Sequence, residues 1–248
     1  MRITVAHLYP NYLNIYADRG NLAVLAERAR RRGVEFAVRS VGPGDEMPAE
    51  VDLYYVGGGQ DREQALVAPD LAARGPALSE AVTDGAVVLA VCGGYQLLGR
   101  FYRDRAGHEQ PGAGLFPLYT LAGERRMIGD VLVECELESG ERRTVVGFEN
   151  HAGRTILDDG AQPLGRVVAG FGNDGESGQE GCRVGNALGT YLHGPLLPRN
   201  PWLADWLLAR AVNHRAGAMP HFDALPDVLE AEAHAVSSAR ARARGGRR

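Results

Sequence analysis

The sequence of 248 residues contains no lysine, and all 27 residues in its count of lysine and arginine are arginine. A P-loop needs a lysine on the phosphates, and Schiff-base or pyridoxal catalysis needs a lysine amine. The chain itself therefore performs neither chemistry. A coding bias toward arginine is the simplest cause of this composition, and the chemical exclusion holds whatever the cause.

Cysteine is also scarce, with three residues at positions 92, 135 and 182. They are too few and too widely spaced for a disulfide framework or a CxxC-type zinc site, so we expect no metal site. No apolar stretch approaches the roughly 18 to 20 residues of a membrane span, and the N-terminus lacks a charged leader before an apolar run. The net charge of -4 gives no electrostatic reason to expect nucleic acid. We therefore expect a cytoplasmic protein.

The first half of the sequence alternates strand and helix signals. Apolar or alternating segments at 3–8, 34–38, 53–56 and 86–91 predict strands, and helical spacing precedes Gly33 and recurs over 70–82. The run at 86–91 is continuous, as in a strand buried on both faces. This rhythm predicts an α/β fold with an open, mostly parallel sheet and helices on both faces.

The second half changes character. Short strands separated by turns, including 129–137 and 143–148, predict a mixed or antiparallel extension of the sheet. A strand over 187–192 leads to a helix that Asn200-Pro201 opens. We expect one domain over residues 1–234 and a basic, disordered tail over residues 235–248, because the C-terminal run ARARARGGRR is strongly charged.

The segment around Cys92 carries the clearest chemical signal. A buried strand meets Cys92 and then Gly93-Gly94 before helical residues, which is the form of a nucleophile elbow. Such a turn puts the sulfur at the carboxyl end of the sheet, where open α/β folds bind ligands, and a helix N-terminus lowers the pKa of the thiol. A lone cysteine at a strand end is more often a small buried hydrophobe. Cys135 and Cys182 fit that reading, whereas the surroundings of Cys92 favour a nucleophile.

A thiolate that attacks an amide also needs oxyanion donors and a base. The N–H of Gly93 lies beside the nucleophile, and Gly57-Gly58-Gly59 ends a neighbouring strand at the same edge of the sheet. His193 follows the strand over 187–192 and is the best-placed base, with His151 as the second candidate. Three glycines alone more often mark a flexible turn.

Together, these motifs resemble the class I, triad-type glutamine amidotransferases, which have a flavodoxin-like fold, and in particular their cobyric acid synthase-like branch. The resemblance rests on three segments: Gly57-Gly58-Gly59, Cys92-Gly93-Gly94-Tyr95-Gln96 and Tyr191-Leu192-His193-Gly194. Flanking segments resemble the GatD family, the glutaminase subunits of lipid II isoglutaminyl synthases. These segments are Tyr9-Pro10 through Asp18-Arg19-Gly20-Asn21, Gly172-Asn173-Asp174-Gly175-Glu176 through Glu180-Gly181, and Gly189 through Pro195.

The resemblance implies a division of labour between two chains. This chain hydrolyses L-glutamine without a cofactor, and a MurT-like Mur-ligase subunit, its heterodimer partner, uses ATP and Mg to amidate D-glutamate of the lipid II stem peptide in peptidoglycan synthesis. The absence of lysine fits this division, because this chain cannot be the P-loop half.

The resemblance also implies roles for single residues. Cys92 is the nucleophile that forms a thioester, and His193 is the general base. The remaining implied residues are the oxyanion donors Gly58, Gly59 and Gly93 and the substrate-binding residues Gln96, Arg126, Asn150 and His151. Arg125 is nearly as good a match as Arg126, and an ordinary solvated arginine pair is the structural alternative.

One position departs from the superfamily pattern. Most members carry glutamate two residues after the histidine, and this chain has Pro195. Either the site works as a dyad or another carboxylate, for which Glu149 is one possibility, substitutes. The alternatives are a glutaminase that serves a cobyrinate-type or other synthetase, a catalytically silent binding subunit, and a cysteine peptidase on a similar fold.

Overall fold

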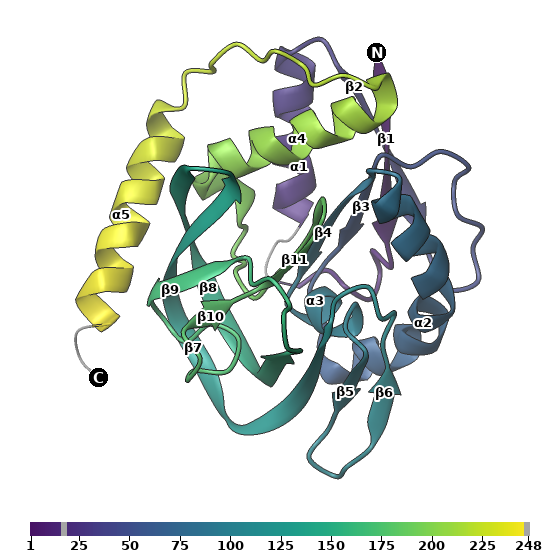
Figure 1. Ribbon diagram of the computed structural model, residues 1–248, viewed down its shortest axis with the longest axis vertical. Coiled ribbons are helices and arrows are strands. Elements are labelled where there is room, and N and C mark those ends of the chain that lie inside the picture. The colour runs from purple at the N-terminus through teal and green to yellow at the C-terminus, as the bar shows by residue number, and fades with distance from the viewer. Residues whose placement is uncertain (16–18, 246–248) are drawn as a thin grey trace.

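The structure is a computed structural model that describes residues 1–15 and 19–245 (Figure 1). Its first sheet contains, in spatial order, β2 (Glu35–Val41), β1 (Arg2–Leu8), β3 (Leu53–Val56), β4 (Val87–Val91), β12 (Ala187–Thr190) and β11 (Cys182–Val184). Only the β11–β12 pair of this sheet is antiparallel. The parallel strands follow the flavodoxin-like order, which confirms the expected α/β class.

Helices cover both faces of this sheet (Figure 1). The helix α1 (Arg19–Arg31) contacts α4 (Pro201–Ala216) on one side, and α2 (Asp61–Thr83) contacts α3 (Gly93–Leu97) on the other. The helix α2 begins at Asp61, nine residues before the expected position 70. The prediction was late because a proline such as Pro69 usually marks the first turn of a helix, whereas here it lies inside the helix. Within the described ranges, no helix is long and apolar enough to cross a membrane.

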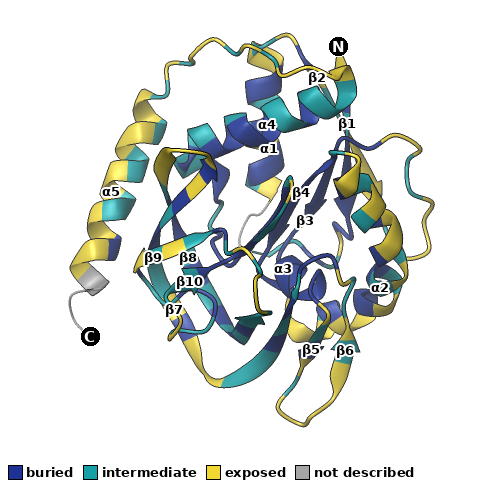
Figure 2. Ribbon diagram, viewed as in Figure 1, coloured by how far each residue is buried: buried dark blue, intermediate teal, exposed yellow. Residues whose placement is uncertain are grey.

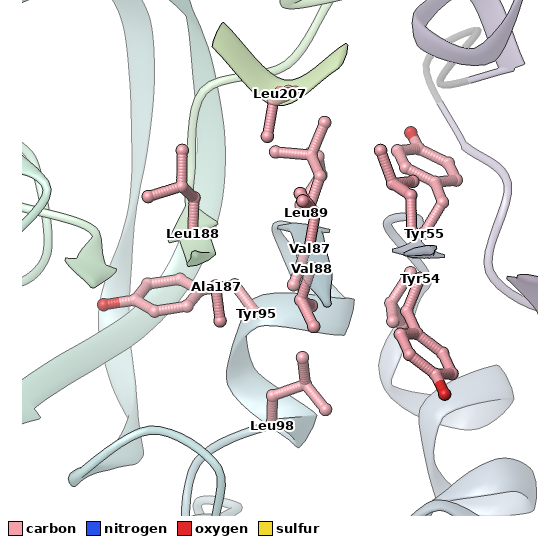
Figure 3. Packing of buried hydrophobic residues seen from close by; sticks show 14 of the residues in the cluster. Tyr54, Tyr55, Val87, Val88, Leu89, Tyr95, Leu98, Ala187, Leu188 and Leu207 are labelled. Carbon is pink, nitrogen blue, oxygen red and sulfur yellow. The ribbon is translucent and has the colours of Figure 1, made fainter. Parts of the chain in front are cut away.

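The centre of the core is β4, whose five residues are all buried. In Figure 3, Leu207 of α4 lies on one side of β4, and Leu98, which follows α3, lies on the other. Figure 2 shows the same pattern at larger scale, with buried central strands and exposed outer faces on α2 and α5. The continuous apolar run in the sequence is therefore the signature of a strand covered on both faces.

The second sheet contains β5 (Phe101–Arg103), β6 (Glu109–Pro111), β7 (Leu118–Glu138), β8 (Glu141–Leu157), β9 (Gly165–Ala169) and β10 (Gln179–Glu180). The strands β7 and β8 form one long antiparallel hairpin. This region forms a separate mixed sheet and does not extend the first sheet as the sequence had suggested. At the outer edge of β11, an isolated bridge between Gln162 and Arg183 stands where a further strand would continue the first sheet. A two-way backbone bridge between Phe148 and His193 joins the second sheet to the end of β12.

The expected disordered tail from residue 235 is wrong as far as residue 245, because α5 (Val228–Gly245) continues through it. The helix packs on β7, β8 and β9, and Ala241 is buried against Leu132, Val146 and Ala169. Alanine and arginine are both good helix formers, so the composition that suggested a solvated tail also supports a helix. Residues 246–248 lie outside the described residues.

The packing of α5 yields a prediction. Ala241→Asp should destabilise the protein by about 2 to 3 kcal/mol, because it buries a carboxylate against apolar side chains. Ala239→Asp is the matched control, since Ala239 is exposed on the same helix. Urea unfolding measures both free energies. Equal midpoints for the two variants would mean that α5 does not pack on the second sheet in solution.

Candidate active site

Cys92 occupies a sharp, strained turn between β4 and α3. Its backbone angles, φ 50° and ψ -107°, lie where L residues are rare. The Cys92 amide donates to the Thr190 carbonyl at 2.8 Å, and its carbonyl accepts from the Gln96 amide at 3.0 Å. The side chain borders a cavity of about 550 Å³. The backbone therefore has the form of a nucleophile elbow, as the sequence pattern indicates.

The two glycines after Cys92 permit a close contact with the end of β3. A Cβ on Gly93 would lie 2.8 Å from the Gly59 nitrogen, and a Cβ on Gly94 would lie 2.6 Å from the Val56 carbonyl oxygen. The Gly94 amide donates to the Gly57 carbonyl at 3.1 Å. No larger residue fits at either position without moving backbone, so the glycines set the distance between elbow and loop.

The carbonyls of the glycine loop are held in fixed directions. The Gly58 carbonyl accepts from the Ile15 amide at 3.1 Å, and the Gly59 carbonyl accepts from Gln64 Nε2 at 3.0 Å. In a trans peptide the N–H points opposite to the carbonyl, so the bond to Ile15 turns the Gly59 N–H away from residue 15. The Gly59 nitrogen also lies 2.8 Å from where a Cβ on Gly93 would stand, so these two glycines are close enough to act as the expected oxyanion pair.

For Gly58 the same rule gives another direction. The Gly57 carbonyl of its peptide faces the Gly94 amide at 3.1 Å, which turns the Gly58 N–H away from the elbow. Of the three glycines that the resemblance assigns to the oxyanion hole, Gly58 is thus the one that the peptide directions do not support.

His193 comes from the neighbouring parallel strand. The register pairs Thr190 of β12 with Val91 of β4, so Cys92 and His193 both leave the sheet at the same edge. His193 is fully buried, and its backbone is bridged in both directions to Phe148 at 3.0 Å. Burial, and then the charges of His151 and Arg126, lowers the pKa of His193 to about 4. The imidazole is therefore neutral at pH 7, the form that a general base requires.

The four expected substrate-binding residues all line the same cavity as Cys92. They are Gln96, Arg126, Asn150 and His151. Arg126 donates from Nε to Asn150 Oδ1 at 2.9 Å and from its terminal nitrogen to the Asn150 carbonyl at 3.0 Å. Arg125 is absent from the described cavity wall. Of Arg125 and Arg126, the structure thus favours Arg126 as the one that reaches a bound ligand, and Arg62 of α2 lines the same cavity.

The sequence analysis assigned no role to Gln64 or Tyr191, which help to shape this cavity. Gln64, from α2, lines it and holds the Gly59 carbonyl, and Tyr191 supports it from behind. The Tyr191 hydroxyl accepts from Gln96 Nε2 at 3.0 Å and bonds the Thr155 hydroxyl at 2.6 Å. Nothing in the local sequence marks Gln64, whereas Tyr191 belongs to the Tyr191-Leu192-His193-Gly194 segment and stands two residues before the candidate base.

The carboxylate of Glu149 does not take the place of the missing superfamily glutamate. It accepts from the amides of Phe171 at 2.7 Å and Gly172 at 2.9 Å, and it lies 3.8 Å from His151 Nε2. Successive residues of a strand face opposite sides, and it is Phe148 that bridges His193. Glu149 therefore supports His151.

Comparison with known proteins identifies the family. The profile of the CobB/CobQ-like glutamine amidotransferase domain matches residues 4–201. The chain belongs to this family. It is 40% identical to the lipid II isoglutaminyl synthase (glutamine-hydrolyzing) subunit GatD of Staphylococcus aureus, over 86% of each chain. It is 39% identical to the corresponding Streptococcus pneumoniae subunit, over 93% of this chain and 88% of that protein.

More distant relatives of this CobB/CobQ-like amidotransferase domain agree on the fold. The cobyric acid synthase of Rhodobacter capsulatus is 34% identical, over 77% of this chain and 40% of that protein. The structure is similar to PurLQS from Thermotoga maritima, with a TM-score of 0.56, 18% identity and coverage of 86% and 96%. It is also similar to the glutaminase domain of Trypanosoma brucei CTPS, with a TM-score of 0.52, 12% identity and coverage of 89% and 96%.

The contact between elbow and glycine loop yields a prediction. Gly93→Ala should lower kcat for glutamine hydrolysis by roughly 100-fold, because the new Cβ displaces the Gly59 peptide and with it one oxyanion donor. Gly129→Ala is the control, since a Cβ there meets nothing within 4 Å. Glutamate release measures the rates, and circular dichroism checks the fold. Unchanged kcat in Gly93→Ala would rule out a role for this contact.

Proposed function

We propose that this protein hydrolyses L-glutamine to glutamate and ammonia through a thioester on Cys92. The ammonia passes to a MurT-like, ATP-dependent ligase subunit. That subunit amidates the D-glutamate of the lipid II stem peptide to D-isoglutamine, a step of peptidoglycan synthesis. The observation that carries the proposal is the strained Cys92 elbow, which borders a cavity beside the glycine loop.

In the first half of the reaction, Cys92 Sγ attacks the side-chain amide carbon of glutamine while His193 takes the thiol proton. The oxygen of the amide becomes negative and is met by the N–H groups of Gly59 and Gly93. The carbon–nitrogen bond then breaks, His193 returns the proton to the leaving nitrogen, and ammonia departs. The acyl group remains on Cys92 as a thioester.

In the second half, water attacks the thioester carbon and gives a proton to His193. The bond to sulfur breaks, the proton returns to Cys92, and glutamate leaves. The net reaction is glutamine plus water to glutamate plus ammonia. Arg126 and the backbone at Asn150 and His151 hold the amino-acid end of the substrate, and Gln96 holds it near the elbow. Their position around one cavity supports these roles.

The assignment of the acceptor rests on sequence identity. The chain is 40% and 39% identical to the two GatD subunits, in alignments that cover 86% and 88% of those proteins, and it is 34% identical to the cobyric acid synthase. The GatD subunits are therefore the better guide to the acceptor. ATP and Mg are expected on the partner, because the lysine-free chain has no P-loop.

A direct assay tests the reaction. The purified chain, with and without a MurT-like partner, should release glutamate and ammonia. Cys92→Ser and His193→Ala should each lower the rate of this release at least about 1,000-fold. Cys135→Ser is the control, because Cys135 is buried away from the cavity. With partner, ATP and lipid II, the product should be amidated lipid II. No release even with the partner would favour a silent binding subunit.

The two neighbouring arginines provide a second test. Arg126→Ala should raise KM for glutamine roughly 10- to 100-fold, the effect of a lost charged hydrogen bond, whereas Arg125→Ala should leave KM near the wild-type value. Of these two arginines, Arg126 is the one that lines the described cavity. Steady-state kinetics over a range of glutamine concentrations separate KM from kcat. The opposite ranking of the two variants would assign the substrate contact to Arg125.

A further inference from the structure

Glu180 is a fully buried carboxyl at the end of β10, outside the cavity. It accepts from the Tyr191 amide at 2.7 Å, and the Thr190 hydroxyl lies 3.1 Å from both of its oxygens. The Thr190 hydroxyl oxygen in turn accepts from the Leu192 amide at 3.0 Å. One carboxyl therefore organises the three residues that lead from β12 to His193.

The amides of Tyr191 and Leu192 need hydrogen-bond acceptors from outside the sheet, because they follow the end of the strand. The ladder of β12 stops at Thr190, so the next N–H groups lose the acceptors that neighbouring strands provide. On one side, Glu180 accepts from the Tyr191 amide, and the Thr190 hydroxyl that Glu180 contacts accepts from the Leu192 amide. On the other side, the Phe148 backbone bridges His193 in both directions at 3.0 Å. The candidate base is thus held through its own backbone by Phe148, and the residues that precede it are held by Glu180.

Glu180 is itself held rigidly. A Cβ on the adjacent Gly181 would lie 2.4 Å from the Gly189 carbonyl oxygen, so this turn is pressed against β12. The Asn173 side chain clamps Gly181, accepting from its amide at 2.8 Å and donating to its carbonyl at 3.0 Å. A carboxyl on such a short, fixed turn can define the position of the backbone that it bonds.

The carboxyl also reaches the substrate cavity through Tyr191. Its bond to the Tyr191 amide fixes a side chain whose hydroxyl accepts from Gln96 Nε2 at 3.0 Å. The Tyr191 ring also stacks on His151 with 3.5 Å between ring centroids. Gln96 and His151 both line the cavity. A shift of residues 190–192 would therefore disturb the base and one wall of the cavity together.

Position 195 itself faces elsewhere. The Pro195 ring lies 2.9 Å from where a Cβ on Gly20 would stand, so it packs against the start of α1. Glu149 is bonded to the amides of Phe171 and Gly172. Neither residue supplies what the superfamily obtains from the glutamate after its histidine.

We propose that Glu180 is the positioning residue of His193, holding residues 190–192 so that the imidazole is aimed at Cys92 and Tyr191 is aimed at Gln96. This inference rests on the proposed glutaminase function. The carboxyl of Glu180 acts on the imidazole through the backbone of residues 190–192.

The protonation state of Glu180 guides the choice of variants. Burial, and to a lesser extent the charge of Glu149, raises the pKa of Glu180 to about 8, so the carboxyl is mostly neutral at pH 7. A neutral carboxyl can accept from the Tyr191 amide with one oxygen and donate to the Thr190 hydroxyl with the other. A glutamine side chain can do the same with its oxygen and its amide nitrogen.

The test compares Glu180→Ala with Glu180→Gln, and Glu176→Gln is the control because Glu176 is exposed in the same segment. Glu180→Ala should lower kcat by roughly 10- to 100-fold with a smaller rise in KM, the scale expected for a lost orienting group. Glu180→Gln should keep kcat within about threefold of wild type, because it keeps both hydrogen bonds. An equal loss in both Glu180 variants would overturn the proposal.

A second readout does not depend on glutamine turnover. Iodoacetamide alkylation of Cys92 at pH 7, followed by peptide mass spectrometry, reports how well His193 activates the thiol. Alkylation should slow in both Glu180→Ala and His193→Ala. The double variant should be no slower than His193→Ala, because both changes remove the same activation of the thiol by the imidazole. Additive losses, or wild-type alkylation in Glu180→Ala, would overturn the proposal.

Thr190→Val covers the case in which Glu180→Ala fails to fold. It removes the hydroxyl between Glu180 and the Leu192 amide while keeping the side-chain shape, and it should slow alkylation in the same direction. Wild-type alkylation in a folded Thr190→Val would count against the inference. Absence of glutamine hydrolysis in the wild-type chain, with the alkylation differences intact, would instead sink the proposed function alone.

Discussion

The candidate site depends above all on one backbone contact, between the turn after β4 and the loop after β3. The Gly94 amide bonds the Gly57 carbonyl, and the space around Gly93 admits no side chain. Because the two strands are parallel neighbours, this contact follows from the register of the sheet, and the Gln64 side chain adds a bond to the Gly59 carbonyl. The candidate nucleophile and the candidate oxyanion donors therefore lie on the ends of regular elements, which favours a fixed geometry between them.

The two sheets divide the work. The first sheet delivers Cys92 and His193, whereas the second delivers the wall that carries Arg126, Asn150 and His151. The bridge between Phe148 and His193 ties these parts together at the candidate base. Tyr191 adds a second link, because it bonds Thr155 and stacks on His151 of β8. A displacement of the long β7–β8 hairpin would therefore move both the cavity wall and the residues that lead to the imidazole.

The parts of this arrangement that depend on neighbouring residues in the chain could be predicted from the sequence. A continuous apolar run followed by Cys92 and two glycines specifies a buried strand and a tight turn, and the placement of His193 follows from its own strand. Contacts such as Gln64 with Gly59, or Glu180 with Tyr191, arise only when distant elements pack, and no local pattern encodes them. The C-terminal helix was misread for a related reason. Its charges were visible in the sequence, whereas the pocket for Ala241 on the second sheet was not.

The strained backbone at Cys92 has a consequence beyond chemistry. A non-glycine residue at φ 50° and ψ -107° costs on the order of 1 to 3 kcal/mol, which is a sizeable share of the stability of an ordinary domain. Glycine would relax the turn at no steric cost, so the strain is a cost that the cysteine side chain imposes on the fold. The proposed nucleophile thus stands at a backbone angle that ordinary side chains avoid, and the turn that presents its sulfur to the cavity is a local cost within an otherwise regular sheet.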